Sequence, residues 1–211
     1  MLNYRENQKK YYCKVGSEYS KYFKKYRIKD KKILYPYINL MKSRFKSPRI
    51  LELGPGSGLS LYYFDKEGFK TTALDFSEKI INVAKKNSPN TKFINSDFLD
   101  YDFKDKKYDG VCAKSFLHLF SKEDARLVLN KIKKILAKKG LVHLSIPIFE
   151  DSSKGFVKRD DFSNSPIQFR KKWNEKEIIN FLKENGFKIF KKSYGTENER
   201  SRNWLNLILE C

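Results

Sequence analysis

The chain has 211 residues, which is enough for one domain with a sizeable hydrophobic core. Hydrophobic residues make up 40% and aromatic residues 15%, with ten glycines and six prolines, so collagen-like, low-complexity and wholly disordered classes are excluded. The formal net charge of +20 would suit a polyanionic partner, which makes the placement of that charge informative.

Much of the positive charge lies in the first quarter of the chain. Residues 1–49 hold 15 basic and three acidic side chains, a net charge of +12. Lysine outnumbers arginine by 36 to 9 and alanine occurs only five times, a profile that AT-rich codons would produce. Two explanations for the charge therefore stay open, contact with nucleic-acid phosphates and codon bias.

The protein is expected to be cytoplasmic. No apolar run reaches the ~18–20 residues of a membrane helix, and the first ten residues lack the apolar segment of a signal peptide. Cys13, Cys112 and Cys211 are an odd number without a CxxC pair, which argues against a disulfide framework and a zinc ribbon. We expect neither a membrane partner nor a metal site, and the sequence leaves the oligomeric state open.

Residues 2–46 are predicted to form helices. Four aromatic residues recur at helical spacing and so share one face: Tyr19, Tyr22, Phe23 and Tyr26. For the last three of these we expect packing of the helix against a sheet. A second helix is predicted from about Asp30 towards Phe45, with a bend before Pro36.

After Pro48 the pattern becomes an alternation of strands and helices. Short apolar strands are predicted at 49–53, 70–74, 92–95, 108–113 and 141–146. Helices are predicted between them, one from the glycine turn to about residue 67, one from an N-cap at Ser77 through Lys86, and one from a capping box at Ser121 through Ala137, stopped by Gly140. Such alternation predicts a parallel sheet that helices cover on both faces.

The C-terminal part of the chain departs from this alternation. Residues 148–170 are polar and are expected to form an irregular functional loop. A capped helix is predicted from Asn174 to Gly186, followed by strands at 187–193 and 203–210 with no helix between them. The sequence therefore predicts an α/β fold with a mostly parallel, seven-stranded sheet that ends in an antiparallel hairpin.

Residues suited to binding a ligand follow the first three predicted strands. A GxGxG turn formed by Gly54, Gly56 and Gly58 lets the backbone approach a ligand closely, although Leu59 stands where a dinucleotide fingerprint has its third glycine. Asp75 ends the second strand and could accept hydrogen bonds from both hydroxyls of a ribose. Asp97 ends the third strand. Each alone is often a turn or a surface carboxylate, but together they indicate one crevice at the carboxyl edge of the sheet.

Five segments carry this pattern in order along the chain: ILELGPGSG, ALDFSEKII, FINSDFLDY, YDGVCAKSFLHLF and KKGLVHLSIP. The ensemble resembles the class I S-adenosylmethionine-dependent methyltransferases, and the closing WNEKEIINFLKENGFKIF and NWLNLILEC are similar to the small-molecule members. The resemblance covers roughly residues 48–211. It implies a Rossmann-like core that binds S-adenosylmethionine (SAM), and residues 1–47, which match only loosely through YYCKVGSEYSKYF, would be a helical cap in the same domain.

The resemblance also implies roles for individual residues. The three glycines of the turn would line the methionine portion of SAM, Asp75 would hold the ribose, and Asp97 with Phe98 would hold the adenine. Phe76, next to Asp75, is also expected to bind the cofactor. Glu52 would organise the turn or bind near the amino group, and Lys114 and Ser115 would lie beside the sulfonium through backbone atoms. Tyr19 could reach the cofactor from the cap. Tyr11 and Tyr12 could also reach the cofactor from the cap.

Methyl transfer requires mainly alignment of the nucleophile with the methyl group, and a general base only if the nucleophile arrives protonated. His118 is the candidate base because it follows the fourth strand, and packing among neighbouring aromatic residues is its alternative role. His143, inside the fifth strand, and Cys112, inside the fourth, are expected to be core residues.

Absent motifs narrow the acceptor. No two prolines are adjacent, so the Asn/Asp-Pro-Pro-aromatic motif of many amino-group DNA, RNA and glutamine methyltransferases is missing, and no Pro-Cys pair offers the nucleophile of cytosine-C5 enzymes. We therefore expect methyl transfer to an oxygen or nitrogen of a small molecule. Two alternatives stay open, an RNA-modifying methyltransferase that uses the basic N-terminal region and a non-catalytic protein that binds SAM or a partner.

Overall fold

The computed structural model describes residues 3–158, 166–197 and 202–211. Its main sheet has seven strands, β1 Arg49–Leu53, β2 Lys70–Asp75, β3 Lys92–Asn95, β4 Tyr108–Lys114, β5 Leu136–Ile148, β8 Lys188–Glu197 and β9 Arg202–Glu210. Their order across the sheet is β3-β2-β1-β4-β5-β9-β8, with β9 antiparallel to both of its neighbours and the other pairs parallel. The predicted fold, a mostly parallel seven-stranded sheet with a C-terminal antiparallel pair, is confirmed.

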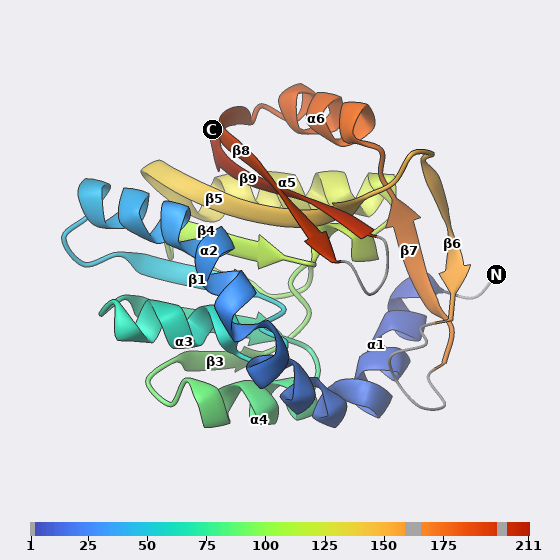
Figure 1. Ribbon diagram of the computed structural model, residues 1–211, viewed down its shortest axis with the longest axis horizontal. Coiled ribbons are helices and arrows are strands. Elements are labelled where there is room, and N and C mark those ends of the chain that lie inside the picture. Colours follow the sequence, from blue (N-terminus) through green and yellow to red (C-terminus); the bar gives the residue numbers. More distant parts are fainter. Residues whose placement is uncertain (1–2, 159–165, 198–201) are drawn as a thin grey trace.

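Helices cover both faces of this sheet (Figure 1). They are α1 Tyr4–Val15, α2 Ser20–Arg44, α3 Leu59–Lys66, α4 Glu78–Asn87, α5 Lys122–Ile135 and α6 Glu175–Glu184, with single 3-10 turns η1 at Gly16–Tyr19 and η2 at Leu117–Leu119. One core cluster joins α5 and α6 to the sheet, and the other joins α2, α3 and Ala84 of α4 to the opposite face. Burial on both faces explains why the strands read as continuous apolar runs.

The predicted helix starts are confirmed by their side-chain caps. The side chains of Ser77, Ser121 and Asn174 accept hydrogen bonds from backbone amides in the first turns of α4, α5 and α6. The end of α5 differs from the prediction, because the helix stops at Ile135 and β5 begins at the next residue. Pairing with the sheet explains the early end of the helix, because Leu136 pairs with Tyr108 of β4.

The N-terminal helices break at a different place from the one predicted. The break is the 3-10 turn at Gly16–Tyr19 and not the region of Asp30, and α2 continues through Pro36. Gly16 packs so closely on α4 that a Cβ there would lie 2.8 Å from Cβ of Lys79. Contact with α4 therefore determines where the chain turns, while the buried Tyr37 and Met41 hold α2 helical beyond its proline.

The segment expected to be an irregular loop contains two strands. The strands β6 Ser153–Val157 and β7 Gln168–Lys172 form a separate antiparallel pair, and Phe156 faces Phe169 across it with 5.8 Å between ring centroids. Residues 159–165, also in the predicted loop, lie outside the described part of the chain. The pair packs beside α1 at one end of the molecule, where it forms part of the site described next (Figure 1).

Candidate functional site

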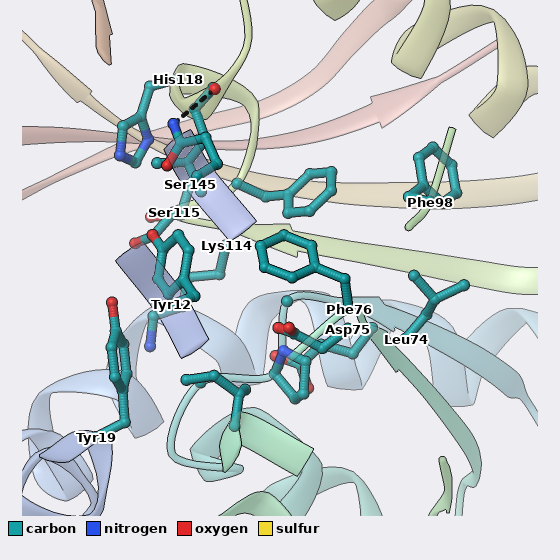
Figure 2. A pocket seen from close by; sticks show the side chains of 18 of the residues that line it. Tyr12, Tyr19, Leu74, Asp75, Phe76, Phe98, Lys114, Ser115, His118 and Ser145 are labelled. Atoms are coloured by element: carbon teal, nitrogen blue, oxygen red, sulfur yellow. Dashed lines mark hydrogen bonds between the residues drawn. The ribbon is translucent and has the colours of Figure 1, made fainter. Parts of the chain in front are cut away.

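A cavity of about 260 Å³ lies where β1, β2 and β4 end, beneath the N-terminal helices. Twelve of the thirteen residues predicted to act in binding or catalysis line it: Tyr12, Tyr19, Glu52, Gly54, Gly56, Asp75, Phe76, Asp97, Phe98, Lys114, Ser115 and His118. Figure 2 shows His118, Ser115 and Ser145 on the side of the cavity away from Leu74 and Phe98. The topology therefore brings these residues from five separate segments to one place.

The glycine turn after β1 forms one wall of the cavity. Gly54 and Gly56 have positive φ angles of 66° and 53°, which other residues rarely adopt. A Cβ at Gly54 would lie 3.1 Å from the ring of Phe116, and one at Gly56 would lie 3.5 Å from the ring of Tyr19. The turn thus keeps its backbone open to a ligand in a place where side chains would fill the space.

Gly58, the third glycine of the predicted set, is not among the described residues that line the cavity. It caps α3 with a φ angle of +76°, and a Cβ there would lie 2.8 Å from the carbonyl oxygen of Ala84 in α4. Its observed role is close packing of the turn against α4, and a direct contact with SAM stays a prediction.

Asp75 stands at the end of β2 with its carboxylate toward the cavity. Its Oδ1 accepts a hydrogen bond of 2.8 Å from the backbone amide of Ser77. Burial and the nearby charge of Asp97 raise the pKa of Asp75 from 3.8 to about 7, although the amide of Ser77 acts in the opposite direction. A carboxylate held in this way gains from any ligand that donates hydrogen bonds to it.

Asp97 is held by two cations of the N-terminal cap. Its Oδ2 lies 3.0 Å from Arg5 Nη2 and 3.3 Å from Lys9 Nζ, while its Oδ1 accepts a hydrogen bond from the amide of Leu99. Burial by itself would raise the pKa of Asp97, but the Leu99 amide and the two cations outweigh it and hold the pKa below its usual value. Sequence reasoning missed Arg5 and Lys9, because nothing in a basic helix indicates which carboxylate it will contact.

The tyrosines of the cap form a row of ring contacts along the cavity. The centroids of Tyr12 and Tyr19 lie 5.9 Å apart, those of Tyr19 and Tyr22 5.4 Å, and those of Tyr22 and Tyr26 5.6 Å. Tyr22 and Tyr26 line the cavity. Tyr26 also packs against the core between α2 and the sheet, as expected, whereas Tyr22 packs against Tyr11 and Val15 within the cap. The helical spacing correctly predicted that these tyrosines share one face of the helix, and that face lies partly against the cavity.

Three other aromatic predictions have different outcomes. Phe23 packs as expected, here against Tyr62 of α3 at 5.3 Å between ring centroids. Tyr11 is fully buried in a small cluster with Val15 and is not among the described cavity-lining residues. Phe98 is only 2% exposed, yet it reaches the cavity and contacts Phe116 edge to face.

His118 lies on the turn η2 and is 2% exposed. Its Nε2 lies 2.7 Å from Nη1 of Arg170 on β7. Because a guanidinium can only donate, Nε2 must be the acceptor, and the imidazole is neutral with its proton on Nδ1. This contact occupies the lone pair that a general base would use, so His118 can take a proton at Nε2 only when Arg170 moves.

A buried chain of amides continues from Arg170 into the cap. The Nε and Nη2 atoms of Arg170 donate hydrogen bonds to Oε1 of Gln168 at 3.2 and 2.9 Å. Gln168 Nε2 donates in turn to Oε1 of Gln8 on α1. Gln8 in turn donates to the carbonyl oxygens of Phe169 and Leu119. The sequence offered no signal for this network, since Gln168 and Arg170 fall in the segment expected to be irregular.

The remaining candidates behave as core residues. His143 and Cys112 are buried between the sheet and α2, with 3.7 Å between Sγ and Nδ1. Burial, with the charge of Lys114 adding to it, lowers the pKa of His143 to about 3, so the imidazole is neutral.

In the described part of the chain, no group of three or more His, Cys, Asp or Glu side chains could hold a metal ion. No helix among the described residues is long and apolar enough to span a membrane.

Comparisons with known proteins agree with this geometry. Residues 50–140 match the family model of a methyltransferase domain, and no curated protein matches the chain. The DhpI–SAH complex has a TM-score of 0.74 at 19% identity, and the match covers 100% of this chain and 98% of that one. The 1,6-didemethyltoxoflavin-N1-methyltransferase of Burkholderia thailandensis, with bound 1,6-didemethyltoxoflavin and S-adenosylhomocysteine, has a TM-score of 0.67 at 16% identity, covering 96% and 89%.

A third similar structure is the glycopeptide N-methyltransferase MtfA, with a TM-score of 0.59 at 15% identity and coverage of 78% and 83%. At these identities the structures establish the fold. The chain has the Rossmann-like fold of the class I methyltransferases, and the family match lies on the part of it that holds the glycine turn, Asp75 and Asp97.

Proposed function

We propose that this protein transfers a methyl group from SAM to an oxygen or nitrogen of a small molecule. The observation that carries the proposal is the convergence of the glycine turn, Asp75 and Asp97 on one cavity within a methyltransferase domain. The SAM-bound and S-adenosylhomocysteine-bound structures to which the chain is similar support the choice of methyl donor.

The residues of the cavity fit SAM in chemical terms. Asp75 offers a carboxylate for the ribose hydroxyls, and Asp97 with Phe98 offers a carboxylate and a ring edge for the adenine. Gly54 and Gly56 leave backbone space that a Cβ would fill, next to which the methionine portion would lie. The further predicted contacts are those of Tyr12, Tyr19, Glu52, Phe76, Lys114 and Ser115, all of which line the cavity.

SAM supplies a methyl group that is already activated for displacement, so the protein has to align the acceptor and exclude water. Alignment of this kind contributes up to ~7–11 kcal/mol to a barrier. The cap helices α1 and α2 cover the cavity and would exclude water from it. For an acceptor that arrives protonated, His118 stays the proposed general base, and its contact with Arg170 must then open first.

The alternative of an RNA substrate is weakened by the ion pairs of the N-terminal bases. Arg5 and Lys9 contact Asp97 and Asp100, and three further bases of the same region have carboxylate partners outside it: Lys42 with Glu67, Arg44 with Glu210 and Arg49 with Asp109. These contacts cancel part of the local positive charge. We therefore favour a small acceptor over RNA. We favour it over the non-catalytic alternative because eleven of the twelve residues predicted to bind SAM line one cavity.

Transfer of a labelled methyl group tests the proposal. The protein is incubated with methyl-labelled SAM and either a small-molecule ultrafiltrate of the source cells or total RNA from the same cells. We expect label to enter the small-molecule fraction and not the RNA, and the Asp75→Ala variant to transfer less. Label that enters only RNA would support the RNA-modifying alternative, and label in neither fraction would support the non-catalytic one.

The salt dependence of RNA binding provides an independent prediction. If N-terminal lysines neutralised phosphates, log K would fall by about 0.7 per contact for each tenfold rise in salt concentration. We expect a shallow or flat dependence, since several of these bases already have protein partners. Titration of total RNA at low and moderate salt measures it, and sub-micromolar, strongly salt-sensitive binding would contradict the small-molecule proposal.

Two expectations from the sequence stay part of this proposal. One is the division into a cap at residues 1–47 and a SAM-binding core at 48–211. The other is a cytoplasmic location, with which the three free thiols of Cys13, Cys112 and Cys211 are compatible.

A further inference from the structure

A polar pair is buried in the main sheet, where β5 and β9 lie side by side. Ser145 of β5 pairs with Asn206 of β9, and the serine hydroxyl donates a hydrogen bond of 2.7 Å to Oδ1 of the asparagine. The two residues are 3% and 4% exposed, and Asn206 stands between the fully buried Leu205 and Leu207. Apolar side chains would pack here without polar atoms to satisfy, so the pair calls for a functional explanation.

The amide of Asn206 is only partly satisfied. Its Nδ2 atom is buried and has no hydrogen-bond partner among the described residues, which lowers the stability of the folded state. The bond from Ser145 is the hydrogen bond that this side chain makes within the same part of the chain. What the asparagine contributes is therefore the orientation of the Ser145 hydroxyl.

This orientation limits what Ser145 can offer to a ligand. Ser145 lines the cavity, whereas Asn206 is not among the described residues that do so. A serine hydroxyl has one proton and two lone pairs. Because the proton is directed at Asn206, Oγ can offer only lone pairs to the cavity. A ligand atom that contacts Oγ must therefore donate a hydrogen bond.

The place of Ser145 in the sheet is on the acceptor side of the proposed donor site. Along the order β3-β2-β1-β4, the strand ends carry the residues proposed for the adenine, ribose, methionine portion and sulfonium: Asp97, Asp75, the glycine turn, and Lys114 with Ser115. Ser145 is on β5, the next strand. It pairs with Lys114, and its carbonyl oxygen accepts a hydrogen bond of 2.8 Å from the amide of Ser115 (Figure 2). Ser145 is therefore adjacent to the point from which the methyl group would be transferred.

Apolar side chains line the cavity on the same face of the sheet. Trp204 lies two residues before Asn206 on β9, so its side chain shares a face with Asn206 and with the directly paired Ser145. Trp204 lines the cavity together with Tyr26 and Ile33 of α2. These three side chains form a wall against which an aromatic or aliphatic acceptor would bury its surface.

We propose that Oγ of Ser145 accepts a hydrogen bond from the nucleophilic group of the methyl acceptor. That group is therefore an O–H or N–H on a small molecule, whose apolar body packs against Trp204 and Tyr26. Asn206 is a positioning residue, because it acts on the acceptor only through Ser145. The inference rests on the proposed function, since it assigns the acceptor side of the same site.

The hydrogen bond fixes the direction of the nucleophile. It holds the proton of the O–H or N–H group at Ser145 and leaves a lone pair of the same atom to face the methyl group. As the new C–O or C–N bond forms, the electrons of the C–S bond stay on sulfur. The proton of the nucleophile leaves to solvent, and Ser145 keeps its own proton throughout.

The experiment uses the protein saturated with S-adenosylhomocysteine, whose affinity is measured first for every variant. Three probes of similar shape are then titrated by ligand-observed NMR: phenol, which donates a hydrogen bond, fluorobenzene, which has no donor, and benzonitrile, which only accepts. We expect Ser145→Ala to weaken phenol binding by roughly three- to tenfold, the usual value of one hydrogen bond, and fluorobenzene binding by less than about twofold. The affinity for S-adenosylhomocysteine should stay unchanged.

Asn206→Leu gives a result that a merely structural role would not produce. Leucine keeps the branched shape of asparagine but accepts no hydrogen bond, so the hydroxyl of Ser145 becomes able to donate to a ligand. We expect benzonitrile to bind this variant roughly three- to tenfold more tightly than it binds the wild type. A loosened site would instead weaken the binding of all three probes together.

Ser193→Ala is the matched control. Ser193 pairs with Asn206 from the other side, on β8, where it is exposed and is not among the described cavity-lining residues. The variant should bind all three probes as the wild type does. The melting temperature of each variant shows whether it folds, and if Ser145→Ala failed to fold, Asn206→Leu would still test the hydroxyl.

Several results would overturn the inference. Unchanged phenol binding in Ser145→Ala, equal weakening of phenol and fluorobenzene, or no phenol binding to the wild type would show that Ser145 holds no donor group. No gain for benzonitrile in Asn206→Leu would overturn the role of Asn206. A large loss of S-adenosylhomocysteine affinity in Ser145→Ala would place Ser145 in the donor site. Failure of the wild-type protein to bind S-adenosylhomocysteine would overturn the proposed function itself, which distinguishes the two failures.

Discussion

Replacing Gly58 by alanine is expected to lower the melting temperature by roughly 4–20 °C. The positive φ angle of +76° costs an alanine about 1–2 kcal/mol, and the overlap of its Cβ with the backbone of Ala84 adds about 1–3 kcal/mol. For a chain of this size each kcal/mol lowers the melting temperature by about 2–4 °C. Thermal unfolding followed by circular dichroism measures the change.

Gly68→Ala is the matched control for this prediction. Gly68 has nearly the same φ angle, +75°, but a Cβ there would have no heavy atom within 4 Å. It should therefore show only the backbone cost, about 1–2 kcal/mol. An equal loss of stability in the two variants would contradict the role assigned to Gly58 in packing the glycine turn against α4.

Replacing Asp75 by alanine is expected to weaken SAM binding by roughly 10- to 150-fold, or about 1.5–3 kcal/mol, the usual value of hydrogen bonds to a charged group. The fold should survive, because the side chain faces the cavity. Asp75→Asn keeps an acceptor for the Ser77 amide and so separates loss of the loop contact from loss of the charge. The control variant Asp100→Asn, which changes an exposed carboxylate, should bind SAM with normal affinity. Wild-type affinity in the Asp75→Ala variant would contradict the proposed ribose contact.

The raised pKa of Asp75 gives this residue opposite effects on stability and on SAM binding as the pH rises from 3.8 to about 7. Its folded-state pKa of about 7 exceeds the ordinary 3.8, so the folded state holds more protons between these values and its stability decreases as pH rises towards 7. Binding of ribose hydroxyls requires the carboxylate and strengthens over the same range. Asp75→Asn should therefore melt at a higher temperature than the wild type at pH 8 while binding SAM more weakly, with little pH dependence of the affinity.

The sequence predicted those parts of the fold that depend on local signals. A pattern of only a few residues identifies the apolar strands, the glycine turn and the caps at Ser77 and Ser121. Parallel pairing of the strands then places Asp75 and Asp97 at the same edge of the sheet. The strands β6 and β7 were missed because their residues are mostly polar, and a two-stranded pair without a continuous apolar face resembles a loop in sequence.

Contacts across long sequence separations could not be predicted. Arg170 lies 52 residues from His118, and Arg5 lies more than 90 residues from Asp97. In a folded chain, a basic side chain could contact many different carboxylates or imidazoles. The tertiary packing of α1 and β7 determines which of these partners Arg5 and Arg170 contact. The same packing turned Tyr22 and Tyr26 toward the cavity, although helical spacing correctly placed them on one face.

The most direct test of the account is titration calorimetry of the purified protein with SAM, S-adenosylhomocysteine and NADH. All three contain an adenosine group that a glycine turn followed by a strand-end carboxylate could hold, so the comparison isolates the assignment of the donor site. We expect saturable binding of SAM and S-adenosylhomocysteine at one site per chain, and weaker or no binding of NADH. Stronger binding of NADH than of either sulfur nucleoside would contradict this assignment.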